Sequence, residues 1–228
     1  MDGNLKSIIE KRISKTMKNL ERNNMMACFV EKKADVISKV VELIKEGETV
    51  SVGGSMTLFE CGVIDHLRSG RYNFQDRYKE GLTRPELEDI YRKAFFADTY
   101  ISSTNAVTEN GELYNVDGNS NRVAAICYGP KSVIIIVGYN KIVDDIDAAV
   151  SRVKRTAAPA NCVRLSCETY CNKKGECMSL ESYGNDKGSG MTSGCNSPAR
   201  ICCSYVVSGY QRVKDRIKVI IVGEELGY

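Results

Sequence analysis

The chain has 228 residues, with 32 Lys and Arg against 29 Asp and Glu, a formal net charge of +3, ten Cys, one His and no Trp. This length allows a substantial core in a single domain over 1–228, while the balanced charge without a basic stripe argues against nucleic-acid binding. The longest apolar run, near 133–137, is too short for a bilayer span, and the charged N-terminal residues lack the apolar core of a secretory signal. We therefore expect a cytoplasmic protein with no membrane partner.

Hydrophobic periodicity predicts helices and strands in alternation. In chain order we expect a helix over 4–22, a strand over 25–30, a helix over 34–45, a strand over 49–52, a helix over 57–67, a loop over 69–81, a helix over 84–96, a strand over 99–103, short strands joined by Gly turns within 109–121, a strand over 133–138, a helix over 144–157 and a strand over 217–222. The continuous β-branched run at 133–138 is typical of a strand buried on both faces of a parallel sheet. The pattern predicts an α/β fold, a layered sheet flanked by helices.

A glycine turn, Gly53-Gly54-Ser55, stands between a predicted strand and a predicted helix. Glycines allow backbone N–H groups to approach a ligand closely, and the hydroxyls of Ser55 and Thr57 add donors. Such a turn suits a phosphate, a carboxylate or another anion. The spacing matches neither a P-loop nor a dinucleotide fingerprint. On these residues alone, an anion site and a tight turn that binds nothing are equally supported.

A second polar segment follows the strand predicted over 99–103 and includes Asn105, Glu109, Asp117 and Arg122. Loops at strand ends are where open α/β sheets bind ligands. Glu109 has the chemistry of a base or nucleophile, and Arg122 can clamp a carboxylate with two hydrogen bonds. Asn and Asp beside Gly also satisfy their own backbone, so turn chemistry is the better explanation for the Asp117-Gly118 pair.

Seven of the ten cysteines fall between residues 162 and 203. A disulfide framework is not expected in a reducing compartment or needed in a domain of this size. Such local crowding therefore predicts that the cysteines bind a metal ion or an iron–sulfur cluster.

Several long stretches resemble the LUD-domain family of lactate-utilisation proteins: GGSMTL, STNAVTENGELYNVDGNSNRVAAICYGP, VIIIVGYNKIV, RVKRTAAPAN and IKVIIVGEELGY. The resemblance, from about residue 5 to the end, implies an α/β fold related to ribose-5-phosphate isomerase, glucosamine-6-phosphate deaminase and coenzyme A transferases. In those relatives the turn equivalent to Gly53–Thr57 commonly meets a phosphate or another anion. Some family members belong to an iron–sulfur system that oxidises L-lactate to pyruvate. Glu109-Asn110-Gly111 is similar to the stretch that carries the nucleophilic glutamate of some coenzyme A transferases.

A subset of this family ends in a C-x5-C-x2-C-x6-C motif, which implies a set of metal ligands here. Cys171 and Cys177 match its first half and Cys195 and Cys202 its second, but 17 residues, 178–194, replace the usual two between the halves. These spacings are wider than the paired C-x2-4-C of structural zinc sites, so they favour a [4Fe-4S] cluster over zinc. The remaining thiols, Cys162, Cys167 and Cys203, are left as alternative ligands or redox partners.

The sequence thus predicts one LUD domain with a Cys-rich loop lobe, an insertion over 161–209. We expect it to bind a small carboxylate or phosphate. We also expect it to bind a [4Fe-4S] cluster, with zinc as the alternative metal. As a redox component it would have an electron-transfer partner protein. The candidate catalytic residues are Glu109 and Arg122; the candidate ligand-binding residues are Gly53, Gly54, Ser55, Thr57, Asn105 and Asp117. Three roles stay open: an oxidoreductase component, a transferase- or isomerase-like enzyme that uses Glu109 and has a structural metal, and a non-catalytic subunit. The oligomeric state also stays open, and a homo-oligomer is one possibility.

Overall fold

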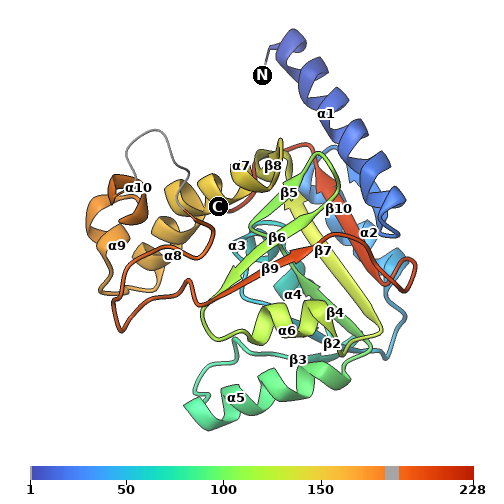
Figure 1. The fold of residues 1–228 in the computed structure, drawn as a ribbon. Coiled ribbons are helices and arrows are strands. Elements are labelled where there is room, and N and C mark those ends of the chain that lie inside the picture. Colours follow the sequence, from blue (N-terminus) through green and yellow to red (C-terminus); the bar gives the residue numbers. More distant parts are fainter. Residues whose placement is uncertain (1, 183–189) are drawn as a thin grey trace.

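A computed structural model of the chain describes residues 2–182 and 190–228, and within them the strands form two sheets (Figure 1). Sheet A has six parallel strands in the order β1-β10-β7-β4-β2-β3, and sheet B has four in the order β8-β5-β6-β9. In sheet B, β6 is antiparallel to both of its neighbours. The strands are β1 (Met26–Val30), β2 (Thr49–Val52), β3 (Asn73–Gln75), β4 (Thr99–Ser102), β5 (Ala106–Thr108), β6 (Leu113–Asp117), β7 (Ser132–Gly138), β8 (Ile142–Val143), β9 (Ser204–Ser208) and β10 (Ile217–Val222).

Local sequence signals explain where several helices begin. The Asp2 side chain accepts hydrogen bonds from the first backbone N–H groups of α1, and Thr83 forms a capping box with Glu86 at the start of α5. The helices are α1 (Gly3–Arg22), α2 (Val36–Leu43), α3 (Met56–Glu60), α4 (Val63–Leu67), α5 (Arg84–Lys93), α6 (Asn121–Cys127), α7 (Ile146–Arg152), α8 (Ala158–Arg164), α9 (Tyr170–Lys174) and α10 (Ser179–Ser182). None of the helices in the described residues is long and apolar enough to cross a membrane.

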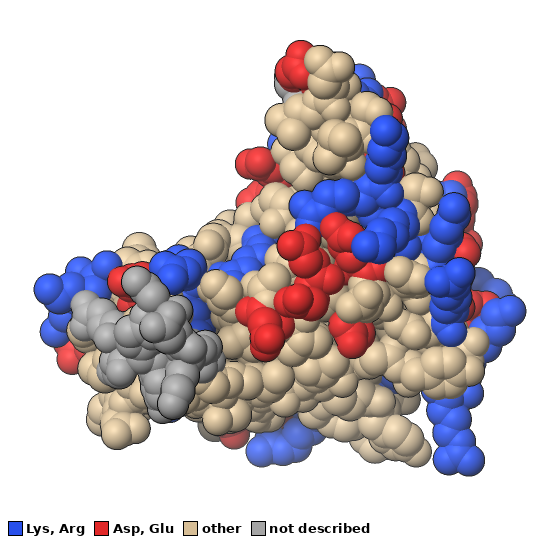
Figure 2. All heavy atoms as spheres, turned by 45° about the horizontal axis from the view of Figure 1, so that its top comes forward, with Lys and Arg blue, Asp and Glu red and all other residues tan. Residues whose placement is uncertain are grey.

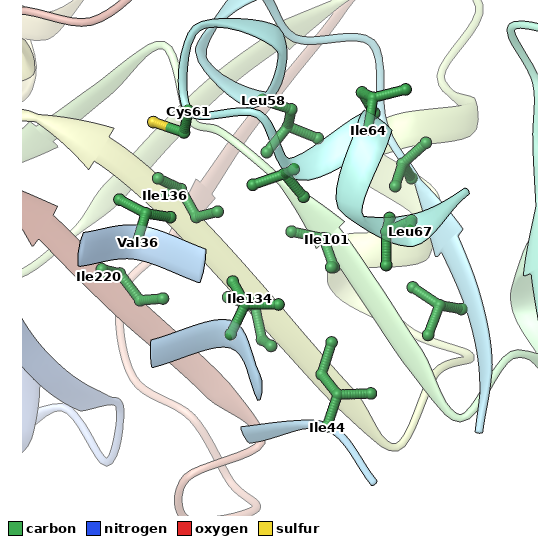
Figure 3. Close-up of a cluster of buried hydrophobic side chains, with 14 of the residues drawn as sticks. Val36, Ile44, Leu58, Cys61, Ile64, Leu67, Ile101, Ile134, Ile136 and Ile220 are labelled. Atoms are coloured by element: carbon green, nitrogen blue, oxygen red, sulfur yellow. The ribbon is translucent and has the colours of Figure 1, made fainter. Parts of the chain in front are cut away.

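The core lies on both faces of sheet A. On β7, Ile134 and Ile136 point into a cluster with α2, α3 and α4 (Figure 3), whereas the alternate residues of the same strand pack against α1, α6 and sheet B. This alternation follows from the two-residue period of a strand. The α/β class, with a parallel sheet flanked by helices, and the doubly buried strand at 133–138 are therefore confirmed.

Sheet B is also covered on both faces. Val107 and Leu113 pack towards sheet A, while Ala106 and Tyr114 pack towards α7 and α8. Because β5 and β6 are short and buried on both faces, they lack the polar alternation that identifies a half-exposed strand in a sequence. The result is a stack of α2–α4, sheet A, sheet B and α7–α8, and α1 projects beyond it (Figure 1).

Several predicted elements need correction. The helix expected over 57–67 is two five-residue helices, α3 and α4, separated at Gly62, whose φ is +69°. The expected loop over 69–81 contains the short strand β3, which pairs with β2. The helix predicted to end at 157 continues through a π-helical turn, Val153–Ala157, into α8.

The Cys-rich loop lobe expected over 161–209 is not confirmed. In the described part of this segment, α9 and α10 follow α8, and β9 at its end pairs with β6 along five residues. The segment therefore contributes a strand to sheet B. Residues 183–189 of the glycine-rich insertion lie outside the described residues.

Candidate functional site

A cavity of about 250 Å³ lies at the carboxyl ends of β2 and β4, and we call it the sheet-end cavity. The glycine turn follows β2, and Asn105 follows β4; Asp117 is the last residue of β6, and Arg122 lies in α6. The structure thus brings together most of the predicted ligand-binding residues. Those that line the cavity are Gly54, Ser55, Asn105 and Asp117, and the candidate catalytic residue Arg122 lines it as well.

Gly53 shapes the turn rather than the cavity wall. A Cβ atom at this position would stand 2.4 Å from Ser102 Oγ and 3.0 Å from Arg122 Cγ, so any side chain here would have to displace the side chains of Ser102 and Arg122. At Gly54 the nearest atom would be 3.7 Å away, on Arg77. The two glycines therefore differ: the first is required by packing, and the second leaves an open approach to the backbone.

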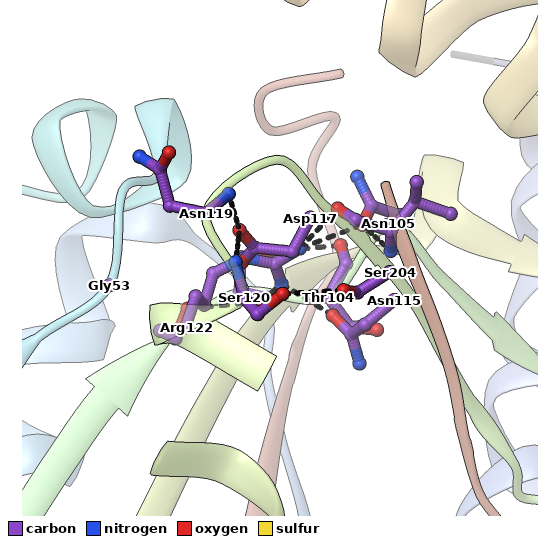
Figure 4. Close-up of polar contacts among 12 residues, drawn as sticks. Gly53, Thr104, Asn105, Asn115, Asp117, Asn119, Ser120, Arg122 and Ser204 are labelled. Carbon is purple, nitrogen blue, oxygen red and sulfur yellow. Dashed lines mark hydrogen bonds and ion pairs between the residues drawn. The ribbon is translucent and has the colours of Figure 1, made fainter. Parts of the chain in front are cut away.

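Arg122 organises one wall of the cavity (Figure 4). Its Nη2 atom donates to Asn105 Oδ1 at 3.0 Å and to the Val116 carbonyl at 2.8 Å, and its Nε lies 3.3 Å from Asp117 Oδ2. Its Nη1 donates to Asn115 and to a backbone carbonyl. Every nitrogen of the guanidinium thus has a protein acceptor, so Arg122 holds the polar loop in place. The pair of donors predicted to clamp a carboxylate ligand is therefore engaged by the protein itself.

Four further cationic residues line the same cavity, and the sequence analysis singled out none of them: Arg77, Lys141, Arg164 and Arg200. Among the described residues none of the four forms an ion pair, and the only Asp or Glu that lines the cavity, Asp117, pairs with Arg122. They lie on four separate segments, so no local pattern marks them. Their one common signal is that the fold places them at one end of sheet A.

Lys141 is the most deeply buried of these cations, with 3% of its surface exposed. Its Nζ donates to Thr57 Oγ1 at 3.1 Å and to Ser103 Oγ at 3.2 Å. Desolvation, and secondarily the positive charges of Arg152 and Arg122, lower the pKa of Lys141 to about 7. Thr57, a predicted ligand-binding residue, therefore contacts this amine instead of lining the cavity.

Two lining hydroxyls have no hydrogen-bond partner among the described residues although they are buried: Ser55 Oγ and Tyr228 Oη. Buried polar groups are usually satisfied, so two unpaired hydroxyls at the cavity wall are an exception that a bound ligand would explain. Because α3 has only five residues, the hydroxyls and the cations, and not a helix N-terminus, supply the groups that favour an anion.

Glu109 lies away from the sheet-end cavity, at the end of β5 against α1. Its carboxylate accepts from Arg12 at 2.6 Å and from Lys15 at 2.7 Å, and these hydrogen bonds and charges lower the pKa of Glu109. Figure 2 shows acidic and basic side chains next to one another on this face, beside the projecting helix. The structure thus does not bring Glu109 together with the other candidate catalytic and ligand-binding residues.

The four predicted metal ligands meet around a second, smaller cavity of about 30 Å³, which we call the cysteine cavity. Cys171, Cys177, Cys195 and Cys202 all line it, as does Cys162, whose Sγ lies 3.5 Å from Cys171 Sγ. Cys167 and Cys203 do not line it. The prediction that sulfurs on both sides of the insertion converge on one place agrees with this arrangement, and Cys162 joins them.

The surroundings of the cysteine cavity bear on what these thiols can hold. Apolar side chains and two cations, Lys154 and Arg200, line it, and burial raises the pKa of Cys202 to about 12. No group of three or more His, Cys, Asp and Glu in the described residues is set to hold a metal ion. Five thiols have the donor chemistry of thiolate-ligated metal sites, whereas burial, by raising the pKa of Cys202, disfavours its thiolate form.

Comparison with known proteins adds the following findings. The profile of the LUD domain matches residues 13–222. No curated protein matches the chain. Similar solved structures include a DUF162 family protein from Deinococcus radiodurans, with 13% identity over 95% of this chain and 98% of that chain and a TM-score of 0.48. Others are eIF2B delta from Chaetomium thermophilum (17% identity, 49% and 48% covered, TM-score 0.34) and ribose 5-phosphate isomerase from Plasmodium falciparum (18%, 49% and 52%, 0.30).

Proposed function

Because the chain belongs to the LUD-domain family, we propose that it serves organic-acid metabolism by binding a small carboxylate or phosphate in the sheet-end cavity and a [4Fe-4S] cluster in the cysteine cavity. The observation that carries the proposal is the charge of the side chains that line the sheet-end cavity: five are cationic, and only one of those in the described residues, Asp117, is acidic. With the cluster as its redox group, the chain is an oxidoreductase component that passes electrons to a partner protein.

The size and polarity of the sheet-end cavity support a small ligand. Its volume, about 250 Å³, is below the roughly 300–1,000 Å³ of pockets that enclose drug-sized molecules, which indicates a metabolite of few carbon atoms. A partly desolvated set of cations is costly without an opposite charge. An anionic ligand supplies that charge and also gives Ser55 Oγ and Tyr228 Oη a partner.

Calorimetric titration with inorganic phosphate and with acetate tests the anion site. Arg164 is exposed on α8, where its guanidinium donates to Asn161, so Arg164→Gln removes a cation from the cavity rim without disturbing the core. We expect this change to weaken phosphate binding about tenfold, the usual worth of one charge-assisted hydrogen bond. Arg155→Gln is the matched control, because Arg155 is also exposed but pairs with Glu176 outside the cavity. Equal affinities for the two variants would contradict the assignment.

The cluster is tested by anaerobic purification, followed by an absorption spectrum and analysis of iron, sulfide and zinc. We expect brown protein with about four irons and four sulfides per chain. Two adjacent cysteines provide a matched pair: Cys202 lines the cysteine cavity, whereas Cys203 is exposed outside it. Cys202→Ser should lose iron and Cys203→Ser should keep it. One zinc per chain would instead make the metal structural, and iron loss in both variants would refute this ligand set.

The alternative hypothesis, a transferase- or isomerase-like enzyme that uses Glu109, has no comparable support from the geometry. Its carboxylate is engaged by two cations of α1, and the sheet-end cavity has no contribution from it. We therefore give Glu109 no part in ligand chemistry, and Arg122 the role of a positioning residue that keeps Asn105 and Asp117 in the cavity wall.

A further inference from the structure

The amine of Lys141 is enclosed by unusual neighbours. Within the described residues its hydrogen-bond partners are the hydroxyls of Thr57 and Ser103, and no carboxylate lies within ion-pair distance. Glu60 and Cys61 act on it only as more distant charges, while two guanidinium groups, Arg122 and Arg152, act in the opposite sense. Lys141 is nevertheless part of the lining of the sheet-end cavity. A buried lysine at a ligand cavity, beside cations and without a counter-ion, is not explained by structural ion pairing.

We propose that Lys141 is a nucleophile that forms an imine with the carbonyl carbon of a small anionic oxo compound held in the sheet-end cavity. The inference rests on the proposed anion site and adds a reacting group to it. The positive side chains around the cavity select the anionic end of such a ligand, either a carboxylate or a phosphate. Lys141 then meets its carbonyl group.

Three features of this chain suit that chemistry. Burial and neighbouring cations keep a large share of the amine uncharged near neutral pH, and only the uncharged amine has a lone pair to donate. The two hydroxyls beside Nζ can pass protons between the amine and the carbonyl oxygen. The buried position also excludes bulk water, which otherwise hydrolyses an imine.

The reaction balances without an oxidant or a reductant. The lone pair of Nζ forms a C–N bond to the carbonyl carbon, and the carbonyl oxygen takes up a proton that leaves the nitrogen, which gives a carbinolamine. The hydroxyl group then departs as water with a second proton from the nitrogen, and a C=N bond remains. One carbonyl compound and one amine thus give one imine and one water.

Reductive trapping tests the inference on the purified holoprotein. The protein is incubated with pyruvate or with dihydroxyacetone phosphate in the presence of cyanoborohydride, and the modified lysines are located by peptide mass spectrometry. We expect one reduced adduct on Lys141, formed with the carboxylate probe, the phosphate probe or both, and suppressed by an excess of inorganic phosphate. Because mapping is done on the unaltered chain, the result does not depend on whether a variant folds.

Two variants and a pH series provide the controls. Lys141→Met should abolish the adduct, while Lys131→Arg, a change at an exposed lysine, should leave it unchanged. With a pKa of about 7, labelling of Lys141 should rise about tenfold between pH 6 and pH 8, against about a hundredfold for an exposed lysine of ordinary pKa.

The outcomes separate this inference from the proposed function. If calorimetry shows that phosphate and pyruvate bind but only exposed lysines are labelled, the anion site stands and the nucleophile is refuted. If neither anion binds and Lys141 is not labelled, both proposals fail. An adduct on Lys141 that competing phosphate does not suppress would refute the role of the cationic cavity in presenting the carbonyl group.

Discussion

Replacing Lys141 by Met should stabilise the protein, and by an amount that depends on pH. In the unfolded chain a lysine has a pKa near 10.4, whereas burial lowers the pKa of Lys141 in the folded protein to about 7. The unfolded state therefore binds more protons between these values, so the stability of the unaltered protein rises with pH across that window. Below the folded pKa both states are protonated, and the full cost of burying the amine is present.

The magnitude follows from the shift of the pKa. At about 1.4 kcal/mol per unit, Lys141 costs the folded protein about 4 kcal/mol at pH 7 and about 2 kcal/mol at pH 9. Met has a similar shape and no charge, but it forgoes the contacts with Thr57 and Ser103, which offsets part of the gain. We thus expect Lys141→Met to gain roughly 2–3 kcal/mol in the free energy of unfolding at pH 7.

Urea denaturation of both proteins at pH 6, 7, 8 and 9 measures this difference. Every other group that titrates is common to the two proteins, so the difference between them isolates Lys141. The advantage of the Met variant should shrink by about 2 kcal/mol from pH 7 to pH 9 and should level off below pH 7. A difference that is independent of pH, or one that grows with pH, would refute the burial of an uncompensated amine.

Four further substitutions check the architecture of the site by denaturation. Gly53→Ala places a Cβ atom 2.4 Å from Ser102 Oγ and should cost about 1–3 kcal/mol, while Gly54→Ala, which has room, should change stability by less than about 0.5 kcal/mol; equal effects would contradict the turn geometry. Arg122→Lys should cost about 2–4 kcal/mol, because a lysine cannot serve the acceptors that the guanidinium reaches, and a neutral result would contradict its role in the cavity wall. Glu109→Gln should lose at most about 1 kcal/mol above pH 5, progressively less as the pH falls, because its partners are solvent-exposed and its pKa is lowered in the folded state. Calorimetry should find its phosphate affinity unchanged, and a large loss would place Glu109 in the ligand site.

The sequence alone predicted the parts of this protein that depend on local burial. Hydrophobic periodicity and runs of β-branched residues predicted α1, α5, β2 and β7, because the burial of one face determines the order of apolar and polar residues along a single segment. The same signal failed for β9 and for the division between α3 and α4. There each segment is five residues long, and long-range pairing with β6 or a single left-handed glycine decides the structure.

The candidate site divides in a similar way. The glycine turn, the polar segment around Asn105 and Asp117 and the crowded cysteines are visible in the sequence, because glycine, amide and thiol chemistry is characteristic of the residue itself. The structure places most of these residues around two cavities. Glu109 shows the limit of this reasoning: only the three residues of β5 separate it from Asn105, yet it lies at the other end of that strand, against α1.

Only the tertiary structure decided which charges meet. Arg77, Lys141, Arg164 and Arg200 stand in four distant segments with nothing in common along the chain, and each looks like an ordinary surface cation. They converge because parallel strands end at one edge of sheet A and because α8 and the segment before β9 fold over that edge. The low pKa of Lys141 has the same origin, since desolvation by neighbours from other segments sets it. The hydrophobic pattern of a segment indicates which of its faces is buried. The electrostatic surroundings of a residue, in contrast, depend on every segment that packs against it.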